Sequence, residues 1–539
     1  MTAEKVFLGV DVGTGSARAG IFDRSGTQLG TGKAPIARHE APGGIAEQSS
    51  DDIWRAVCRA VRGALSAAKV DPEVVAGIGF DATCSLVVLG DGGAPLPVGD
   101  PKATDRDIIV WKDHRAVEQA ARINETCHDV LRYVGGRMSP EMQTPKLLWL
   151  KENRPEIFSL AWQFFDLTDY LGWRATGSLA RSSCTVTCKW TYLAHEARWD
   201  ESYFRQIGLE ELVAEGFSRI GTRIVPPGSP LGHGLTRAAA EDLGLCPGTA
   251  VGAGLIDAHA GGIGTIGAGE DGPEANLAYV FGTSSCTMTT TREPVFVPGV
   301  WGPYYAAMVP GAWLNEGGQS CAGAAIARLI DLHPFSAEAG RRADEAGQAL
   351  PDWLAAETTA RVATAGEAVR LAAGLHVVPE FLGNRAPHAD PYTRAVIAGL
   401  GLESDLDSLV ALYVAGICGI GYGLRQIIEA QADMGISIAR VVLSGGAGHS
   451  VTVQQLLADA GGVEVAIPAT KEPVLLGASI LGSVAAGSFR DLSEAMAGMS
   501  RFGDRIHPMG GDISYRHAAR YRVFRQFQNT MREAAAADA

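Results

Sequence analysis

The sequence lacks the features expected of a nucleic-acid-binding, secreted or membrane-spanning protein. Its 46 Lys and Arg are outnumbered by 60 Asp and Glu, for a formal net charge of −14. This balance disfavours proteins that bind nucleic acid through a basic surface. The longest apolar stretch, residues 409–424, is shorter than a membrane span and predicts a buried core helix. The N-terminal residues do not read as a signal peptide. We therefore expect a cytoplasmic protein without nucleic-acid or membrane partners.

Disulfide and zinc patterns are also missing from the sequence. None of the nine cysteines forms a C-x-x-C pair. Cys184 and Cys188 are four residues apart, but no His or Cys pair stands nearby at zinc spacing. The pattern predicts reduced thiols, most of which fill the core.

Of the two common phosphate-binding motifs, one is missing and the other is in the wrong place. No G-x-x-x-x-G-K-[ST] occurs, which excludes a Walker-A nucleotide triphosphatase. A G-x-G-x-x-G does occur at Gly262, Gly264 and Gly267, but it follows an expected helix rather than a strand, without a suitably placed ribose-binding acid. We interpret it as a chance match in a glycine-rich chain.

What the sequence does contain is a glycine-rich hairpin near its start. Residues 6–10 and 19–22 predict two strands, and the turn between them includes Gly13, Thr14, Gly15 and Ser16. Such a turn presents several N–H and hydroxyl groups to one phosphate. Asp11 can hold Mg²⁺, partly through water, and Arg18 adds a positive charge. The alternative is an ordinary hairpin with a surface aspartate.

Two further glycine clusters lie in the second half of the chain. Residues 277–281 predict a strand that leads into the turn Gly282, Thr283 and Ser284. This segment resembles the first hairpin, so we expect it to bind phosphate as well. After an expected strand at 440–443, a third cluster suits adenine and ribose, the alternative being a simple strand-to-helix turn. Its candidate residues are Gly445, Gly446, Ala447 and Ser450.

Length and pattern together predict the domain organisation. A chain of 539 residues is too long for a single hydrophobic core. Strand hairpins followed by helices, such as the one expected at 51–68 with Ser50 or Asp51 as its cap, indicate an α/β protein. The repeated hairpin predicts two similar domains, at 1–258 and 259–510. The apolar spacing of the tail predicts an amphipathic helix within 511–539.

Three further segments carry a resemblance to a known family. They are 79–87 (GFDATCSLV), 111–115 (WKDHR) and 379–391 (PEFLGNRAPHADP). With the glycine clusters, they make the chain resemble the FGGY carbohydrate kinases and, within them, the D-ribulokinase-like pentulose kinases. The resemblance implies a two-domain actin-like ATPase (ribonuclease H-like) fold with a catalytic cleft between the domains. One departure is Gln143, where the family's motif ending at residue 149 usually has a small residue.

The resemblance also implies which residues do the chemistry. Asp257 corresponds to the catalytic carboxylate that accepts the proton of a sugar hydroxyl, and with Asp11 it would frame Mg²⁺; helix capping is its alternative role. The implied sugar-binding residues are Asp81, Ala82, His114, Lys189, Asp257 and Glu316, with Arg115 beside them. A surface ion pair between Asp113 and Arg115 and a solvated Lys189 are the alternatives to sugar contact.

The function so implied is transfer of the γ-phosphate of ATP to D-ribulose, giving D-ribulose 5-phosphate, with ATP and Mg²⁺ as cofactors. L-ribulose, xylulose and a pentitol such as ribitol are alternative acceptors. A different class of function is a regulatory protein that binds sugar and nucleotide on the same fold without kinase activity. The expected partners are a small sugar and ATP, and a homodimer is compatible with the resemblance.

Overall fold

The computed structural model describes residues 4–269 and 271–538. In the N-terminal half, the central sheet has the strand order β12-β6-β1-β2-β3. β1 is antiparallel to β2 and parallel to β6, and β6 is parallel to β12. The carboxyl ends of three parallel strands therefore meet at one edge of this sheet. The bounds are β1 (Val6–Val12), β2 (Ser16–Phe22), β3 (Gln28–Pro35), β6 (Val75–Ala82) and β12 (Ala250–Ile256).

The C-terminal half repeats this arrangement in a seven-stranded sheet of order β15-β16-β14-β13-β19-β20-β21. Its β13–β14 hairpin is antiparallel, and β13 is parallel to β19, as β1 is to β6. Both hairpins predicted from the sequence are therefore present, each at the centre of a sheet. The bounds are β13 (Asn276–Phe281), β14 (Ser285–Thr291), β15 (Trp301–Tyr305), β16 (Trp313–Gln319), β19 (Arg440–Gly445), β20 (Glu464–Pro468) and β21 (Phe502–Ile506).

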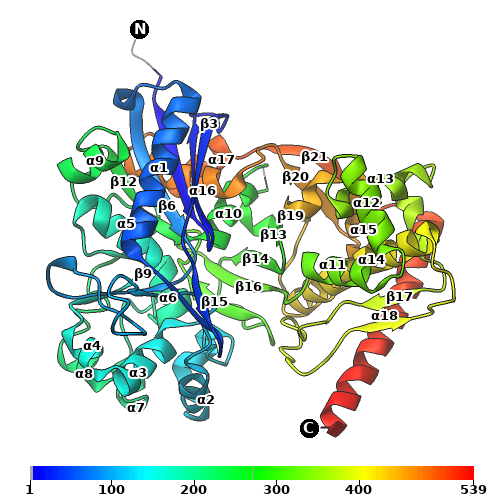
Figure 1. Cartoon of the computed structure of the whole chain (residues 1–539), viewed down its shortest axis with the longest axis horizontal. Coiled ribbons are helices and arrows are strands. Elements are labelled where there is room, and N and C mark those ends of the chain that lie inside the picture. Colours follow the sequence, from blue (N-terminus) through cyan, green and yellow to red (C-terminus); the bar gives the residue numbers. More distant parts are fainter. Residues whose placement is uncertain (1–3, 270, 539) are drawn as a thin grey trace.

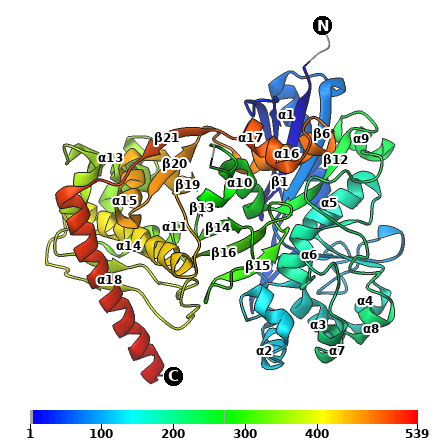
Figure 2. The same ribbon diagram turned by 180° about the vertical axis from the view of Figure 1, so that it is seen from behind.

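Two helices cross between the halves. α10 (Asp257–Ile266) follows β12 of the first sheet and packs on β13 of the second, whereas α16 (Pro473–Ala485) follows β20 and packs on β1, β6 and β12. Figure 1 shows this exchange in colour, because the orange α16 and α17 (Leu492–Met499) lie on the blue N-terminal half. Figure 2 shows α16 beside β1 and β6 from behind. The predicted domain limit at 258/259 falls inside α10.

Glycine allows these two helices to touch backbone to backbone. A Cβ on Gly264 would lie 2.0 Å from the carbonyl oxygen of Pro473, and one on Gly477 would lie 1.9 Å from that of Ala260. Gly262, Gly264 and Gly267 all lie on α10 or at its C-terminal end, so the G-x-G-x-x-G pattern lies within a helix rather than after one. Its glycines serve close packing, and rejecting it as a dinucleotide site agrees with this position.

The rest of the N-terminal half covers the central sheet and carries a second sheet of order β4-β5-β8-β7-β9. The predicted helix at 51–68 is α1 (Ser50–Ala68), but its cap is Ser49, one residue earlier than expected, accepting from the N–H of Asp52. The strands of this sheet are β4 (His39–Ala41), β5 (Ile45–Gln48), β7 (Leu86–Leu89), β8 (Ile108–Ile109) and β9 (Gln163–Asp166), and a separate two-stranded sheet pairs β10 (Arg181–Ser182) with β11 (Ile224–Val225). The helices are α2 (Val117–Glu125), α3 (Gln143–Asn153), α4 (Pro155–Leu160), α5 (Leu167–Thr176), α6 (Ser183–Trp190), α7 (Glu201–Gln206), α8 (Glu210–Ala214) and α9 (Arg237–Leu243).

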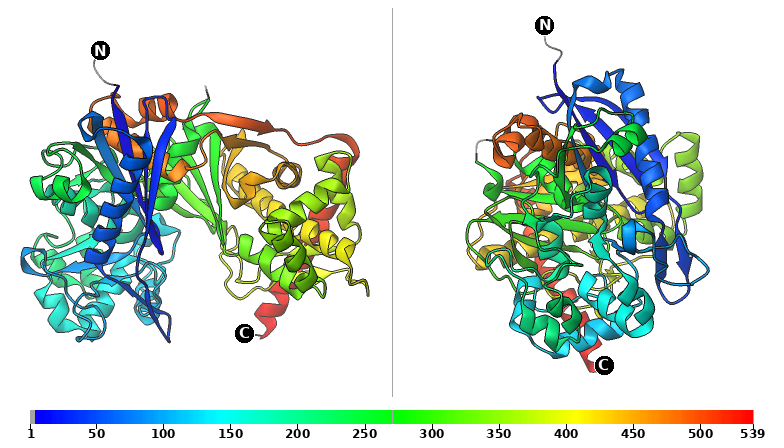
Figure 3. Two further views of the ribbon diagram at one scale, coloured as in Figure 1. Left: turned by 45° about the horizontal axis from the view of Figure 1, so that its top comes forward. Right: turned by 90° about the vertical axis from the view of Figure 1, so that its left-hand side faces the viewer.

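In the C-terminal half, the expected core helix is α14 (Leu406–Asp433), the one helix of the described residues that is long and apolar enough to span a membrane. Because 72% of its apolar window is buried inside the protein, it is a core helix here. The predicted tail helix is α18 (Gly511–Asp538), with Tyr521 and Phe524 buried against α14. The remaining elements are α11 (Gly323–Leu332), α12 (Ser336–Glu345), α13 (Leu350–Ala360), α15 (Val451–Gly461), β17 (His376–Val378) and β18 (Val396–Ala398). Figure 3 shows the two halves side by side, joined by green segments from the middle of the chain and by an orange segment near its C-terminus.

Candidate active site

Three carboxylates meet at the shared edge of the first sheet. Asp11 near the end of β1 is paired in register with Asp81 on β6, and Asp257 directly follows β12. Asp81 is 0% exposed, and neither of its oxygens accepts a hydrogen bond from the described residues. Burial, with Asp11 and Asp257 close by, raises the pKa of Asp81 well above its ordinary value. Burial and Asp11 raise the pKa of Asp257 to about 6. The cluster has an excess of negative charge, so it suits a hard cation such as Mg²⁺.

One oxygen of Asp257 is bound locally, by the backbone of the helix that it begins. It is the first residue of α10, and its Oδ1 accepts a hydrogen bond of 2.8 Å from the N–H of Ala258. The N-cap of α10 is Ile256, which makes no side-chain cap bond, so the capping alternative is wrong. The contact with Ala258 uses only one oxygen of the Asp257 carboxylate. Oδ2 is left for chemistry at the junction of the two halves.

Arg18 is held by carboxylates. Its Nε lies 2.7 Å from Asp11 Oδ2, and its Nη1 lies 2.7 Å from Glu472 Oε2, just before α16. The guanidinium therefore ties the first hairpin to the chain that enters α16. Its positive charge partly offsets the negative charge of Asp11, and its nitrogens contact carboxylates rather than pointing into an open phosphate site.

The first hairpin presents open backbone donors. Its turn is closed by a 3.1 Å bond from Gly13 N to Ser16 O, and Thr14 O accepts from Gln48 Nε2 at 2.9 Å. The Thr14 hydroxyl accepts from the Trp111 indole at 3.0 Å. Among the described residues, no acceptor binds the N–H groups of Thr14 and Gly15. A turn held rigidly with free N–H groups is suited to an anion.

The second hairpin borders a cavity of about 590 Å³. Backbone N–H groups at the start of α11 hold it, since Gly323 donates to Gly282 O at 3.0 Å and Ala324 donates to Thr283 O at 3.1 Å. The side chain of Ser284 is partly exposed beside them. Apolar side chains form much of the cavity wall, including Ile326, Tyr413, Ile417 and Val453. A flat heteroaromatic base fits such a wall.

The third glycine cluster lies at the rim of the same cavity, but its members differ in role. Gly446 and Ser450 line the cavity, and Ser450 also caps α15 by accepting from Val453 N. Gly445 has φ of +89°, and a Cβ there would lie 2.1 Å from the carbonyl oxygen of Phe281. Packing against β13 is therefore enough to require glycine at position 445, whether or not a ligand binds there. The side chain of Ala447 lies outside the described part of the chain.

Beside the carboxylates, both halves contribute buried charges. Lys189 on α6, His259 on α10 and Glu316 on β16 meet there, and Glu316 Oε2 lies 3.4 Å from His259 Nε2. Burial opposes ionisation of Glu316, but Lys189 and His259 lower its pKa to about 2. Burial likewise opposes the charge on Lys189, yet Cys84 and Glu316 raise the pKa of this lysine well above its usual range. The alternative of a solvated Lys189 is therefore wrong.

Three residues near this cluster, Trp301, Tyr304 and Arg385, were not among the site residues predicted from the sequence. The indole of Trp301 lies near two cations, with Lys189 Nζ 5.6 Å and Arg385 Cζ 5.5 Å from its ring centroid. The hydroxyl of Tyr304 is buried without a hydrogen-bond partner among the described residues. Arg385 belongs to the segment 379–391 and could have been noted there, whereas no sequence signal marks Trp301.

Three residues that the sequence predicted beside the sugar, Ala82, His114 and Arg115, have surroundings that differ from one another. Ala82 is fully buried on β6, opposite Ile256 of β12. The His114 side chain is 54% exposed, 3.6 Å from Glu141. Arg115 is only 2% exposed and is held at 2.8 Å by both Asp113 and Glu47. The alternative of a surface ion pair is wrong, because this ion pair is buried. The guanidinium of Arg115 is occupied by these two carboxylates, and its contact with the sugar stays a prediction.

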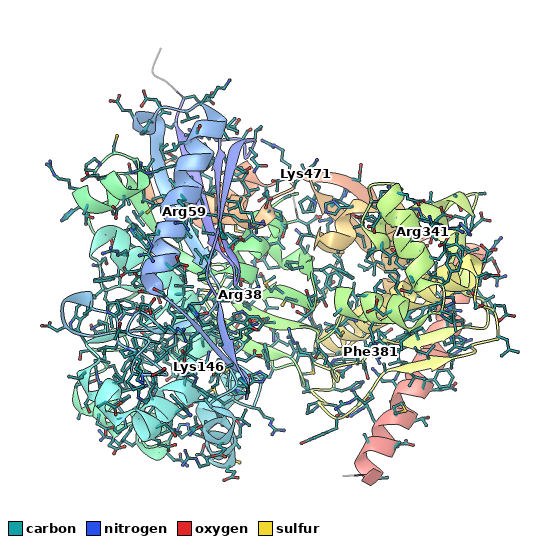
Figure 4. All side chains as sticks on the ribbon, in the orientation of Figure 1. Arg38, Arg59, Lys146, Arg341, Phe381 and Lys471 are labelled. Carbon is teal, nitrogen blue, oxygen red and sulfur yellow. The ribbon has the colours of Figure 1, made fainter. Side chains whose placement is uncertain are left out.

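The hydrogen bonds of Gln143 explain why a glutamine stands here in place of the small residue of the family pattern. Its Nε2 donates to the carbonyl of Cys84 and to Asp166 Oδ2, both at 3.0 Å. One turn further along α3, Lys146 donates to the carbonyl of Val110 at 3.1 Å and lies inside the N-terminal half (Figure 4). The amide therefore fixes the loop after Asp81 in place, which a small residue could not do.

Comparisons with known proteins concern the chain as a whole. Residues 6–264 match the model of the FGGY family of carbohydrate kinases, N-terminal domain, and residues 277–486 match the C-terminal domain of the same family. A human FGGY carbohydrate kinase domain-containing protein is 47% identical, over 97% of this chain and 96% of its own length. A D-ribulokinase of Saccharomyces cerevisiae is 38% identical, over 90% of this chain and 72% of its own.

A solved structure shares the whole architecture. The gluconate kinase of Lactobacillus acidophilus superposes with a TM-score of 0.82 at 21% identity, covering 100% of both chains. At that identity the likeness concerns the fold, which is the actin-like ATPase fold.

Proposed function

The chain belongs to the FGGY family of carbohydrate kinases, and from this premise we propose that it phosphorylates D-ribulose with ATP, giving D-ribulose 5-phosphate. The observation that carries the proposal is the position of Asp257. It stands at the end of β12, beside two acidic groups of its own sheet and next to buried charges to which both halves contribute. The similarity to a D-ribulokinase supports the choice of sugar.

The residues present fit ATP and Mg²⁺. The free N–H groups of Thr14 and Gly15 and the exposed Gly282 and Thr283 are suited to phosphates, and the apolar cavity beside them is suited to adenine. Asp11 and Asp257 are the carboxylates that would hold Mg²⁺. Asp81 is close to both, and neither of its oxygens has a hydrogen-bond partner among the described residues. When bound, Mg²⁺ supplies positive charge that offsets the charge of the phosphates.

Asp257 is proposed to accept the proton of the terminal sugar hydroxyl. Its Oδ1 is fixed by the N–H of Ala258, which sets the direction of the carboxylate. A carboxylate that orients the hydroxyl and receives its proton at Oδ2 lowers the barrier mainly through positioning. Closure of the halves would exclude water from this point.

The sugar itself is proposed to bind Lys189, Glu316 and His259. A ketopentose offers hydroxyls that both donate and accept, and these side chains supply a cationic donor, an anionic acceptor and an imidazole. Because they come from α6, β16 and α10, both halves must be in place to bind the sugar. Trp301 adds an apolar face beside Lys189. Cytoplasmic localisation and a homodimer stay predictions.

A panel of acceptors tests this proposal. ADP release is measured with D-ribulose, L-ribulose, D-xylulose, ribitol and glycerol, and kcat/KM is compared among them. We expect the highest value for D-ribulose. A higher value for another acceptor would replace the sugar while retaining the kinase. ADP release independent of every sugar would contradict the kinase function and favour a regulatory binding protein.

A further inference from the structure

A second chemical cluster adjoins the proposed sugar site and shares His259 with it. Cys184 and Cys188 are four residues apart on α6, so their thiols share one face of the helix. The fold brings His259 of α10 to the same place, with its Nδ1 3.1 Å from Cys184 Sγ. The two sulfur atoms and a ring nitrogen all lie within 4.8 Å of one another. The sequence spacing alone concealed this, because the histidine is 75 residues away.

These distances fit a tetrahedral thiophilic ion. Zn–S bonds of about 2.3 Å and Zn–N bonds of about 2.0 Å place ligand atoms roughly 3.5–3.8 Å apart. The cluster therefore needs only small side-chain shifts to take up such an ion. All three side chains are buried, with at most 1% exposed. Burial keeps the three ligand side chains away from bulk solvent.

The surroundings of the cluster supply the outer contacts that metal-binding histidines use. With Nδ1 turned to the cysteines, the other nitrogen of His259 lies 3.4 Å from Glu316 Oε2. A carboxylate on the far nitrogen fixes the tautomer of a zinc-bound imidazole. The backbone N–H of Ile256 points at Cys184 Sγ at 3.4 Å, which supports negative charge on that sulfur.

We propose that Cys184, Cys188 and His259 form a Zn²⁺ site, with Glu316 orienting the histidine. On binding, both thiols release their protons to solvent, and the two thiolates neutralise the charge of the ion. The fourth coordination position is left to water or another small ligand, as in zinc sites with three protein ligands. The site differs from the Mg²⁺ site in its chemistry, since soft sulfur ligands select zinc and hard oxygen ligands select magnesium.

Cobalt(II) is the probe that tests the site, independently of kinase activity. The full chain is freed of metal by a chelator under reducing conditions and titrated with Co²⁺ without nucleotide. We expect one Co²⁺ per chain, visible bands of tetrahedral cobalt and a thiolate charge-transfer band, all removed by Zn²⁺. Carboxylate ligands give no thiolate band, so binding at Asp11 and Asp257 is distinguished.

Variants locate the ion. Cys184→Ser with Cys188→Ser should abolish the thiolate band, whereas Cys127→Ser, at an exposed cysteine, should leave it unchanged. Glu316→Gln should retain the band but weaken affinity by about 10-fold, as loss of an outer partner does. If the double variant does not fold, the rate at which the two cysteines of the wild-type chain are alkylated in partly unfolding urea, compared with and without Zn²⁺ by mass spectrometry, gives the same answer. A wild-type chain without the band, or a band that survives in the folded double variant, would overturn the proposal.

Discussion

The charges of the site are arranged in two groups that differ in sign. Asp11, Asp81 and Asp257 form a set of carboxylates with Arg18 as the cation that contacts Asp11, and the pKa of both Asp81 and Asp257 is raised by burial and by the neighbouring acids. Next to them, Lys189 and His259 outnumber Glu316. A free cation therefore suits the first group, and a neutral polyhydroxyl ligand can bridge the second.

Glu316→Gln tests the sugar-binding group. The amide keeps the shape of the side chain but removes the charge that faces Lys189 and His259. A hydrogen bond to a charged group contributes about 1.5–3 kcal/mol, so kcat/KM for the sugar should fall by about 10–100-fold. KM for ATP should change little, and the surface variant Glu338→Gln should behave as wild type. An unchanged kcat/KM for the sugar would remove Glu316 from the binding site.

Asp166→Asn tests the cost of a buried carboxyl behind the site. Burial and the nearby Asp169 raise the pKa of Asp166 to about 8. A group whose folded pKa is raised stabilises the fold fully below its unfolded pKa, and this contribution is lost as pH rises towards the folded value. Asparagine does not titrate, so the variant should gain stability relative to wild type between about pH 4 and about pH 8.

The measurement is urea unfolding of both proteins at about pH 5 and about pH 8. Asp105→Asn, at an exposed position, is the matched control. A difference between variant and wild type that does not grow with pH would show that the carboxyl of Asp166 is ionised in the folded protein.

At the scale of elements, the α10–α16 contact holds the two halves together. Each helix leaves one sheet and packs on the other, and Asp257 is the first residue of α10. The distance between these helices therefore sets the distance from Asp257 to the other half. Glycines at the contact are as important to the site as the residues that carry charge.

Gly477→Ala tests this contact. The added Cβ would lie 1.9 Å from the carbonyl oxygen of Ala260, so the helices must separate. Overpacking costs about 1–3 kcal/mol and should exceed the gain of up to about 1 kcal/mol that alanine brings to a helix. We expect a lower urea midpoint and a reduced kcat.

The matched control is Gly340→Ala on α12, where a Cβ would meet no atom within 4 Å. This variant should be at least as stable as wild type, because only the helix propensity changes. If Gly477→Ala were equally stable, the close approach of α10 and α16 would not be essential.

Local patterns predicted the elements, whereas long-range contacts decided the roles of several residues. The two hairpins, α1 and α14 follow from turn chemistry and apolar spacing within one segment. The burial of Arg115 depends on Glu47, which stands 68 positions earlier, so local sequence gave no indication of it. Gly264 is explained only by Pro473, and His259 meets Cys184 only in the fold.

At the scale of the whole molecule, the two halves built around the repeated sheet supply different groups of the site. The N-terminal half supplies the carboxylates and the first hairpin, and the C-terminal half supplies the second hairpin and the apolar cavity. Neither half holds a complete set. This division is what the proposed reaction requires, because ATP and sugar must meet at the junction, where Asp257 lies.

Asp257→Asn with D-ribulose is the most direct test of the account. Asparagine keeps the size of the side chain but cannot accept the hydroxyl proton, so sugar-dependent ADP release should fall by at least about 100-fold. Binding of ATP in the absence of Mg²⁺, measured by calorimetry, should change little, which separates chemistry from nucleotide affinity. The wild-type chain should form one D-ribulose 5-phosphate per ADP. A variant that retains more than a few per cent of wild-type activity, or a wild-type chain that releases no sugar-dependent ADP, would contradict the account.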